Sequence, residues 1–235
     1  MCKVALSLLK HQVMIQNTPN LLYKEHEVRV DSFIKNCIFS YIGQVAENGS
    51  MLTYMFRQVN HLKTNQFATP PTFLSPLCEP RLTNCNLIFI DDFVGTGKTV
   101  TDFWNTCVSL IKKKLPNVKI YLLALVATDE AIDVIRQHTG ITLICPQILG
   151  SDYKVFDDNS SIFRNMSKRQ TAKNMCQYYG EQLVGNRENA LGYKGSQLLI
   201  GFHHNTPNNT LPVIWADTKI GERQWQPLFE RKRKV

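Results

Sequence analysis

The stretch from residue 87 to residue 99 constrains the fold more than any other part of the sequence. It begins with four bulky apolar residues, 87–90, the pattern of a short strand buried on both faces of a parallel sheet. Two carboxylates, Asp91 and Asp92, follow at the expected strand end, and a loop rich in Gly and Thr then leads into a helix. Ligands of open α/β sheets bind at the carboxyl ends of strands, so this junction predicts a binding site.

The loop after the carboxylates has the chemistry of a phosphate site. Gly95 and Gly97 allow a tight turn with inward N–H groups, Thr96 and Thr99 add hydroxyl donors, and the following helix N-terminus favours an anion. A P-loop ATPase is a weaker alternative, because its pattern requires glycine where Asp92 stands. The alternative without function is a tight strand-to-helix turn with a solvated Asp pair.

From residue 87 onward, strand and helix patterns alternate. A helix with one apolar face follows the loop and ends before Pro116, and strands are predicted over 118–126 and 141–145. Between those strands Thr128 offers an N-cap to a helix that ends at Gly140. The apolar face of the first helix comprises Val100, Phe103, Trp104, Cys107, Leu110 and Ile111. We therefore predict an α/β fold with a doubly wound, mostly parallel sheet.

The first eighty residues indicate helices. Helical patterns cover 4–15, 30–45 and 51–62, and the spacings of three and four over 30–45 mark one apolar face. That face comprises Val30, Phe33, Ile34, Cys37, Ile38 and Ile42. The predicted organisation is therefore a helical N-terminal region over 1–80 and an α/β core with a C-terminal recognition segment over 81–235.

The last third of the chain adds a helix and a polar loop. After a loop at 157–161, the predicted helix has one apolar face, and a strand is predicted over 198–202. The helix face comprises Ala172, Met175, Cys176, Tyr179 and Leu183. The loop after residue 202 is dense in hydrogen-bond donors and acceptors, which favours a recognition site. The alternative is an Asn/Pro turn with exposed histidines. The candidates in this loop are His203 and His204 as acid or base, and Asn205, Asn208 and Asn209 as acceptor contacts.

Composition indicates a soluble globular protein with an anionic partner or substrate. The formal net charge is +8, and 43% of residues are hydrophobic. The seven cysteines form no Cys-x-x-Cys pair, which favours a reducing cytoplasm over a metal or disulfide framework, and no apolar stretch is long enough to span a membrane. Basic residues near two segments are candidates for binding nucleic acid, and solvated helix faces or a solvated chain end are the alternative. These nucleic-acid candidates are Lys168, Arg169, Lys173, Arg231, Lys232 and Arg233.

The motif of residues 88–99 resembles the phosphoribosyl-pyrophosphate (PRPP) loop of type I phosphoribosyltransferases. That loop has an apolar strand, two acidic residues and Thr-Gly-x-Thr, matched here by Asp91-Asp92 and Thr96-Gly97-Lys98-Thr99. The resemblance implies that the acidic pair holds the ribose hydroxyls of PRPP. It also implies that residues from Val94 to Thr99 enclose the 5′-phosphate, with Mg²⁺ needed for the departing pyrophosphate.

Later segments resemble the phosphoribosyltransferase-like domain of bacterial conflict systems. They are Asn205-Thr206-Pro207-Asn208-Asn209-Thr210-Leu211-Pro212, which leads to Trp215, and Trp225-x-Pro227-Leu228-Phe229-x-Arg231. The resemblance implies a toxin-like effector of retron-type antiphage defence that modifies or depletes nucleotides or nucleic acid. Its implied partners are a reverse transcriptase and the multicopy single-stranded DNA of that enzyme, and whether the effector is a homo-oligomer stays open.

Two departures from the superfamily pattern bear on activity. The position that holds an Asp in purine phosphoribosyltransferases is Gly95, which has no side chain to handle a purine proton. No clear pyrophosphate loop is found over 60–85, where Thr64-Asn65-Gln66 is the nearest candidate. A module that senses PRPP or a nucleotide without chemistry is therefore the second hypothesis.

Overall fold

The computed structural model describes residues 1–17, 23–43, 48–70 and 85–231. The chain forms two compact units, Met1–Ile148 and Leu149–Val235. The sequence predicted a boundary between residues 80 and 81 instead. Strand β1 (Cys37–Tyr41) and helix α3 (Asn48–Val59) lie before that boundary, yet both belong to the first unit, because β1 pairs with the next strand of its sheet.

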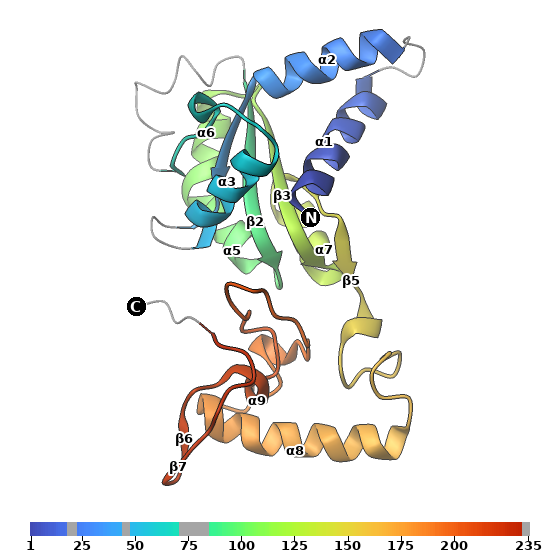
Figure 1. Ribbon diagram of the computed structural model, residues 1–235, viewed down its shortest axis with the longest axis vertical. Coiled ribbons are helices and arrows are strands. Elements are labelled where there is room, and N and C mark those ends of the chain that lie inside the picture. Colours follow the sequence, from blue (N-terminus) through green and yellow to red (C-terminus); the bar gives the residue numbers. More distant parts are fainter. Residues whose placement is uncertain (18–22, 44–47, 71–84, 232–235) are drawn as a thin grey trace. The chain divides into compact units, whose positions relative to one another are not determined.

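A sheet organises the first unit, and its registered pairs are parallel (Figure 1). The strand order is β1-β2-β3-β4, and β5 also pairs with β3. This confirms the predicted α/β class with a mostly parallel sheet, including the strands predicted over 87–90, 118–126 and 141–145. The remaining strands are β2 (Asn86–Val94), β3 (Lys119–Thr128), β4 (Thr142–Ile144) and β5 (Gln147–Leu149).

Strand β1 replaces part of a predicted helix. Helix α2 (Tyr23–Lys35) ends where the helix predicted over 30–45 should continue, so that prediction is wrong beyond residue 35. All five side chains of β1 are buried, and Cys37 pairs with Asn86 of β2. A strand buried on both faces has consecutive apolar residues, and such a run also contains spacings of three and four.

Helices cover both faces of this sheet. On one face, Phe56 of α3 packs on Phe39 of β1, with ring centroids 5.7 Å apart. The opposite face of β1 contributes Ile38 to a core that also contains Val100, Ile111 and Ile135. The helices not yet bounded are α1 (Cys2–Asn17), α5 (Lys98–Phe103), α6 (Ser109–Lys114) and α7 (Asp129–His138). Helices on both faces are the arrangement expected of a doubly wound sheet, and the helices predicted over 4–15 and 51–62 are confirmed.

A π-helical turn, η3 (Trp104–Val108), joins α5 to α6. It moves the buried face of this helical segment by about one residue. Val108, absent from the predicted apolar face, is fully buried, whereas the predicted Leu110 is 41% exposed.

The second unit is built around helix α8 (Met166–Val184) and a small core of its own. Helix α8 confirms the predicted helix, but Met175 of the predicted apolar face is exposed. The predicted strand over 198–202 is wrong, because only isolated bridges at Leu198 and Phe202 form there. The core comprises Val155, Phe156, Leu191 and Leu211. Short elements complete the unit, among them η4 (Ser151–Tyr153), η5 (Tyr193–Gly195), α9 (Pro212–Trp215), β6 (Lys219–Ile220) and β7 (Arg223–Gln224).

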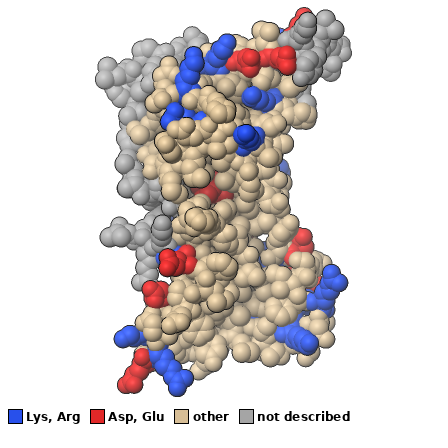
Figure 2. All heavy atoms as spheres, viewed as in Figure 1, with Lys and Arg blue, Asp and Glu red and all other residues tan. Residues whose placement is uncertain are grey.

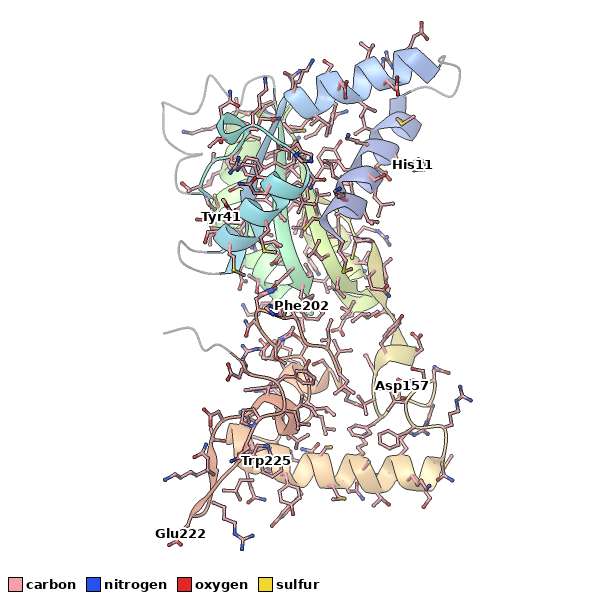
Figure 3. All side chains as sticks on the ribbon, viewed as in Figure 1. His11, Tyr41, Asp157, Phe202, Glu222 and Trp225 are labelled. Carbon is pink, nitrogen blue, oxygen red and sulfur yellow. The ribbon has the colours of Figure 1, made fainter. Side chains whose placement is uncertain are left out.

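Trp225 is an anchor of this second unit. Its ring lies 5.5 Å from that of Tyr179 on α8, and its Nε1 donates to the carbonyl of Val213 at 3.1 Å (Figure 3). In the described part of the chain, no helix has the length and apolar character needed to cross a membrane.

Candidate functional site

The two carboxylates lie inside strand β2. The strand continues to Val94, beyond the end predicted at Ile90, because the ladder with β3 continues through Val94. Strand β1 stops earlier, with Tyr41 level with Ile90. Asp91 and Asp92 therefore extend past β1 at the carboxyl edge of the sheet, where ligands of such sheets bind.

Both carboxylates are half-buried, which places them between the core and solvent. Adjacent strand residues start on opposite faces of a sheet. The Asp91 carboxylate nevertheless turns along the chain, because its Oδ1 accepts from the Asp92 N–H at 2.9 Å. Carboxylate oxygens at such an edge are suitable acceptors for hydroxyl groups of a sugar.

The loop from Gly95 to Gly97 turns sharply into α5. Gly97 has φ +72°, a left-handed conformation that favours glycine. Its carbonyl accepts from both the N–H and the hydroxyl of Thr101, each at 2.9 Å, which locks the start of the helix. Lys98 forms an exposed ion pair with Asp102 at 2.5 Å, and the side chain of Thr99 is exposed.

Strand β1 forms a second part of this edge, which the sequence interpretation missed. Because Tyr41 pairs with Ile90, Ile42 and Gly43 follow β1 at the same end of the sheet as the two carboxylates. Gly43 there has φ +107°, and the buried hydroxyl of Ser40 has no partner among the described residues. The short buried run 37–39, followed by a glycine, was the available signal, but the helical spacing concealed it.

The pyrophosphate-loop candidate Thr64-Asn65-Gln66 lies at the opposite edge of the sheet. Phe67 pairs in parallel with Phe39, so the three residues before it lie toward the amino end of β1. The Gln66 side chain donates to the carbonyl of Ile34, which precedes β1, at 2.7 Å. This placement separates the segment from Asp91 by the length of the strand.

The histidine and asparagine candidates belong to the second unit. His203 and His204 occupy a turn closed by paired Phe202 and Asn205, and the His204 ring stacks on Phe202 with centroids 5.6 Å apart. Figure 3 labels Phe202 on this turn. His203 is exposed, so the turn presents one histidine to solvent and holds the other against an aromatic ring.

Asn208 and Asn209 are tied into the core of the same unit. The Asn208 carbonyl accepts from the Tyr193 N–H, and the Asn209 carbonyl accepts from the Leu198 N–H and the Ser196 hydroxyl. Asn209 is 5% exposed, so these contacts indicate a structural role for that residue.

Two of the basic candidates hold the second unit together. Arg169 donates to the carbonyls of residues 157 and 158 and pairs with the Asp158 carboxylate at 2.5 Å. Arg231 lies over the Trp215 ring at 5.0 Å and donates to the Thr206 carbonyl at 2.7 Å, and burial lowers its pKa.

The other basic candidates stay untested predictions. Lys168 is exposed and Lys173 is half-buried, whereas Lys232 and Arg233 lie outside the described residues. On the visible face of the second unit, Figure 2 shows basic side chains interspersed with acidic ones. Charge on that face is therefore mixed.

Comparison with known proteins identifies the family. The model of the PRTase-CE family, a group of phosphoribosyltransferase-like domains, matches residues 7–231. The chain belongs to the PRTase-CE family. That match includes both units and the carboxylate-and-glycine motif of β2, so the resemblance inferred from 88–99 is confirmed at the level of the superfamily.

Other comparisons are more distant. Among solved structures, orotate phosphoribosyltransferase from Aeropyrum pernix matches with 13% sequence identity and a TM-score of 0.33. The match covers 62% of this chain and 69% of that one, and a similarity this low supports no inference about the present protein. No curated protein matches the chain.

Proposed function

We propose that this PRTase-CE protein is a phosphoribosyltransferase-type transferase that binds PRPP or a related ribose-phosphate donor at the carboxyl edge of its parallel sheet. The observation that carries the proposal is the continuity of β2 with the loop. Two half-buried carboxylates, Asp91 and Asp92, lie near the end of β2, and the left-handed Gly97 begins α5 five residues after Asp92. Family membership supports the same donor class.

In the proposed complex, Asp91 and Asp92 accept hydrogen bonds from the two ribose hydroxyls. Residues 94–99 surround the 5′-phosphate, with the hydroxyls of Thr96 and Thr99 available as donors. The bond between ribose C1 and the pyrophosphate oxygen breaks, and a nucleophilic atom of the acceptor bonds to C1 through an oxocarbenium-like state. Positioning and electrostatic stabilisation supply most of the rate enhancement in such a reaction.

The carboxylate oxygens at this edge fit a metal ion that binds together with the phosphates of the substrate. In the described residues, no group of three or more His, Cys, Asp or Glu side chains is arranged to hold a metal ion. Mg²⁺ is commonly bound by one or two carboxylates plus substrate phosphates, and Asp91 and Asp92 are the carboxylates present here. When bound, Mg²⁺ would neutralise charge on the departing pyrophosphate.

The proposal also concerns the molecule that accepts the ribose phosphate. We propose a nucleotide or nucleic-acid acceptor, which the basic net charge of +8 favours. A purine base handled as in purine phosphoribosyltransferases is disfavoured, because Gly95 has no side chain to exchange a proton. The role in retron-type antiphage defence, with a reverse transcriptase and its single-stranded DNA as partners, rests on the resemblance of the later segments.

A binding experiment tests the donor site. Isothermal titration calorimetry with PRPP and Mg²⁺, against ATP and NAD, is performed on the wild type, Asp91→Asn and Asp92→Asn. Each substitution weakens a charge-assisted hydrogen bond, so we expect about tenfold to hundredfold weaker PRPP binding. The matched control is Asp133→Asn, which removes an exposed carboxylate on α7 that pairs with Arg136.

Three outcomes distinguish the hypotheses. PRPP binding that is lost in both site variants but kept in Asp133→Asn supports the donor site. Pyrophosphate release in the presence of nucleotides, NAD or single-stranded DNA then separates a transferase from a module that only senses the donor. Binding and hydrolysis of ATP without PRPP binding would contradict the proposal and favour an ATPase.

A further inference from the structure

Thr128 connects the proposed phosphate loop to helix α7. It is the last residue of β3 and the N-cap of α7, and its side chain is buried. The capping role was predicted: Thr128 Oγ1 accepts from the Ala131 N–H at 3.0 Å. The same hydroxyl donates to the carbonyl of Gly95 at 2.5 Å, across 33 positions of sequence. The one proton of this hydroxyl is therefore used in the hydrogen bond to Gly95 of the loop.

The bond to Gly95 sets the direction of the next N–H group. The C=O and N–H of a trans peptide unit point in opposite directions, and no described peptide bond is cis. Holding the Gly95 carbonyl toward Thr128 therefore turns the Thr96 N–H away from Thr128. That N–H has no acceptor among the described residues.

A second contact holds the loop on the other side of Thr96. A Cβ added to Gly97 would lie 3.0 Å from Cγ1 of Val134 and 3.3 Å from the carbonyl oxygen of Ala131, so Gly97 sits directly against α7. Helix α7 thus supports the loop at Gly95 and at Gly97. Glycine has the greatest conformational freedom of all residues, so a peptide between two glycines needs such external support to keep one orientation.

We infer that Thr128 is a positioning residue that orients the Gly95–Thr96 peptide, so that its N–H faces the anionic group bound by the loop. Identifying that group as the 5′-phosphate of a ribose donor rests on the function proposed above. The orientation of the peptide does not rest on it. Thr128 acts through the loop and does not itself touch the ligand.

Four variants test the inference. Thr128→Val removes both hydrogen bonds with little change in shape, and Thr128→Ser keeps both. Thr128→Asp keeps a good N-cap but has no proton to donate to Gly95, so it breaks the loop contact while α7 stays capped. The matched control is Thr139→Val at the other end of α7, where the hydroxyl donates to Ile135 and accepts from Ile141.

The first readout needs no ligand. Amide order parameters from nitrogen-15 relaxation are measured for Thr96 and Gly97. We expect values near 0.85 in the wild type, Thr128→Ser and Thr139→Val, and values below about 0.6 in Thr128→Val and Thr128→Asp. Unchanged order parameters in the Val and Asp variants would overturn the inference.

The second readout is calorimetric binding of ribose 5-phosphate. Loss of one oriented donor weakens binding by about fivefold to tenfold in Thr128→Val, with recovery in Thr128→Ser. Equal affinity in wild type and Thr128→Val would also overturn the inference. If the wild type binds neither ribose 5-phosphate nor PRPP, the proposed function fails, and the order parameters alone decide whether Thr128 positions the loop.

Discussion

Replacing Gly97 with alanine tests the contact between the loop and helix α7. Gly97 has φ +72°, and a left-handed conformation costs a residue with a Cβ about 1–2 kcal/mol. The new methyl would also lie 3.0 Å and 3.2 Å from two carbons of Val134, inside the roughly 3.5–4.0 Å of optimal carbon contacts. Such overpacking adds about 1–3 kcal/mol, so we expect the unfolding free energy to fall by about 2–5 kcal/mol in total.

Two comparisons separate strain from clash, each measured by urea unfolding followed by circular dichroism. Gly185→Ala has nearly the same strain, with φ +74°, but its Cβ would meet nothing within 4 Å, so its cost is the conformational share alone. A double-mutant cycle with Val134→Ala stays within the first unit. We expect Gly97→Ala to cost at least about 1 kcal/mol less when Val134 is truncated. Additivity within about 0.5 kcal/mol would refute the clash.

Three further predictions concern stability. Gly180→Ala on α8 places a Cβ 2.0 Å from the backbone oxygen of Ala190. We therefore expect the unfolding free energy of the second unit, measured in urea, to fall by about 3 kcal/mol or more. A smaller loss would mean that α8 moves away from Ala190 at little cost. Arg231→Met keeps the apolar stem but loses the cation–π contact with the Trp215 ring and the hydrogen bond to the Thr206 carbonyl. Thermal unfolding should therefore report a loss of about 1–2 kcal/mol. Unchanged stability would contradict a structural role for the Arg231 guanidinium. Burial raises the pKa of Cys37, so the unfolded chain loses the thiol proton at a lower pH than the folded chain does. The contribution of Cys37 to stability is therefore intact below about pH 8.5, and above it the unfolding free energy should fall by up to about 1.4 kcal/mol per pH unit. Urea titrations at pH 8, 9 and 10 should show a smaller slope in Cys37→Val.

Local sequence patterns were sufficient for most of the region from residue 87 to residue 145. The strands there are short apolar runs, and Thr128 precedes its helix with the spacing of an N-cap. These signals act within a few residues, so they need no knowledge of the rest of the chain. The fold class and the order of strands and helices followed from them.

The same reasoning was wrong where tertiary packing decides between alternatives. The run 37–41, apolar except for Ser40, suits either a helix or a buried strand, and only pairing with β2 makes it a strand. At Leu198, likewise, the partner is Thr210, twelve residues further along the chain, and the structure forms an isolated bridge there in place of the predicted strand. Three-residue strands such as β5 carry too few residues for a period to be recognised.

The sequence by itself determined which groups stand at the candidate site, because Asp91, Asp92 and the glycines that follow are consecutive and their chemistry is local. Only the tertiary structure decided how they are held: β1 beside β2, the Thr128 hydroxyl on the Gly95 carbonyl, and Val134 against Gly97. It also committed Arg169 and Arg231 to contacts within their own unit. The reason is physical, since a hydrogen bond or a close packing contact depends on positions in space that residues distant in sequence acquire only when the chain has folded.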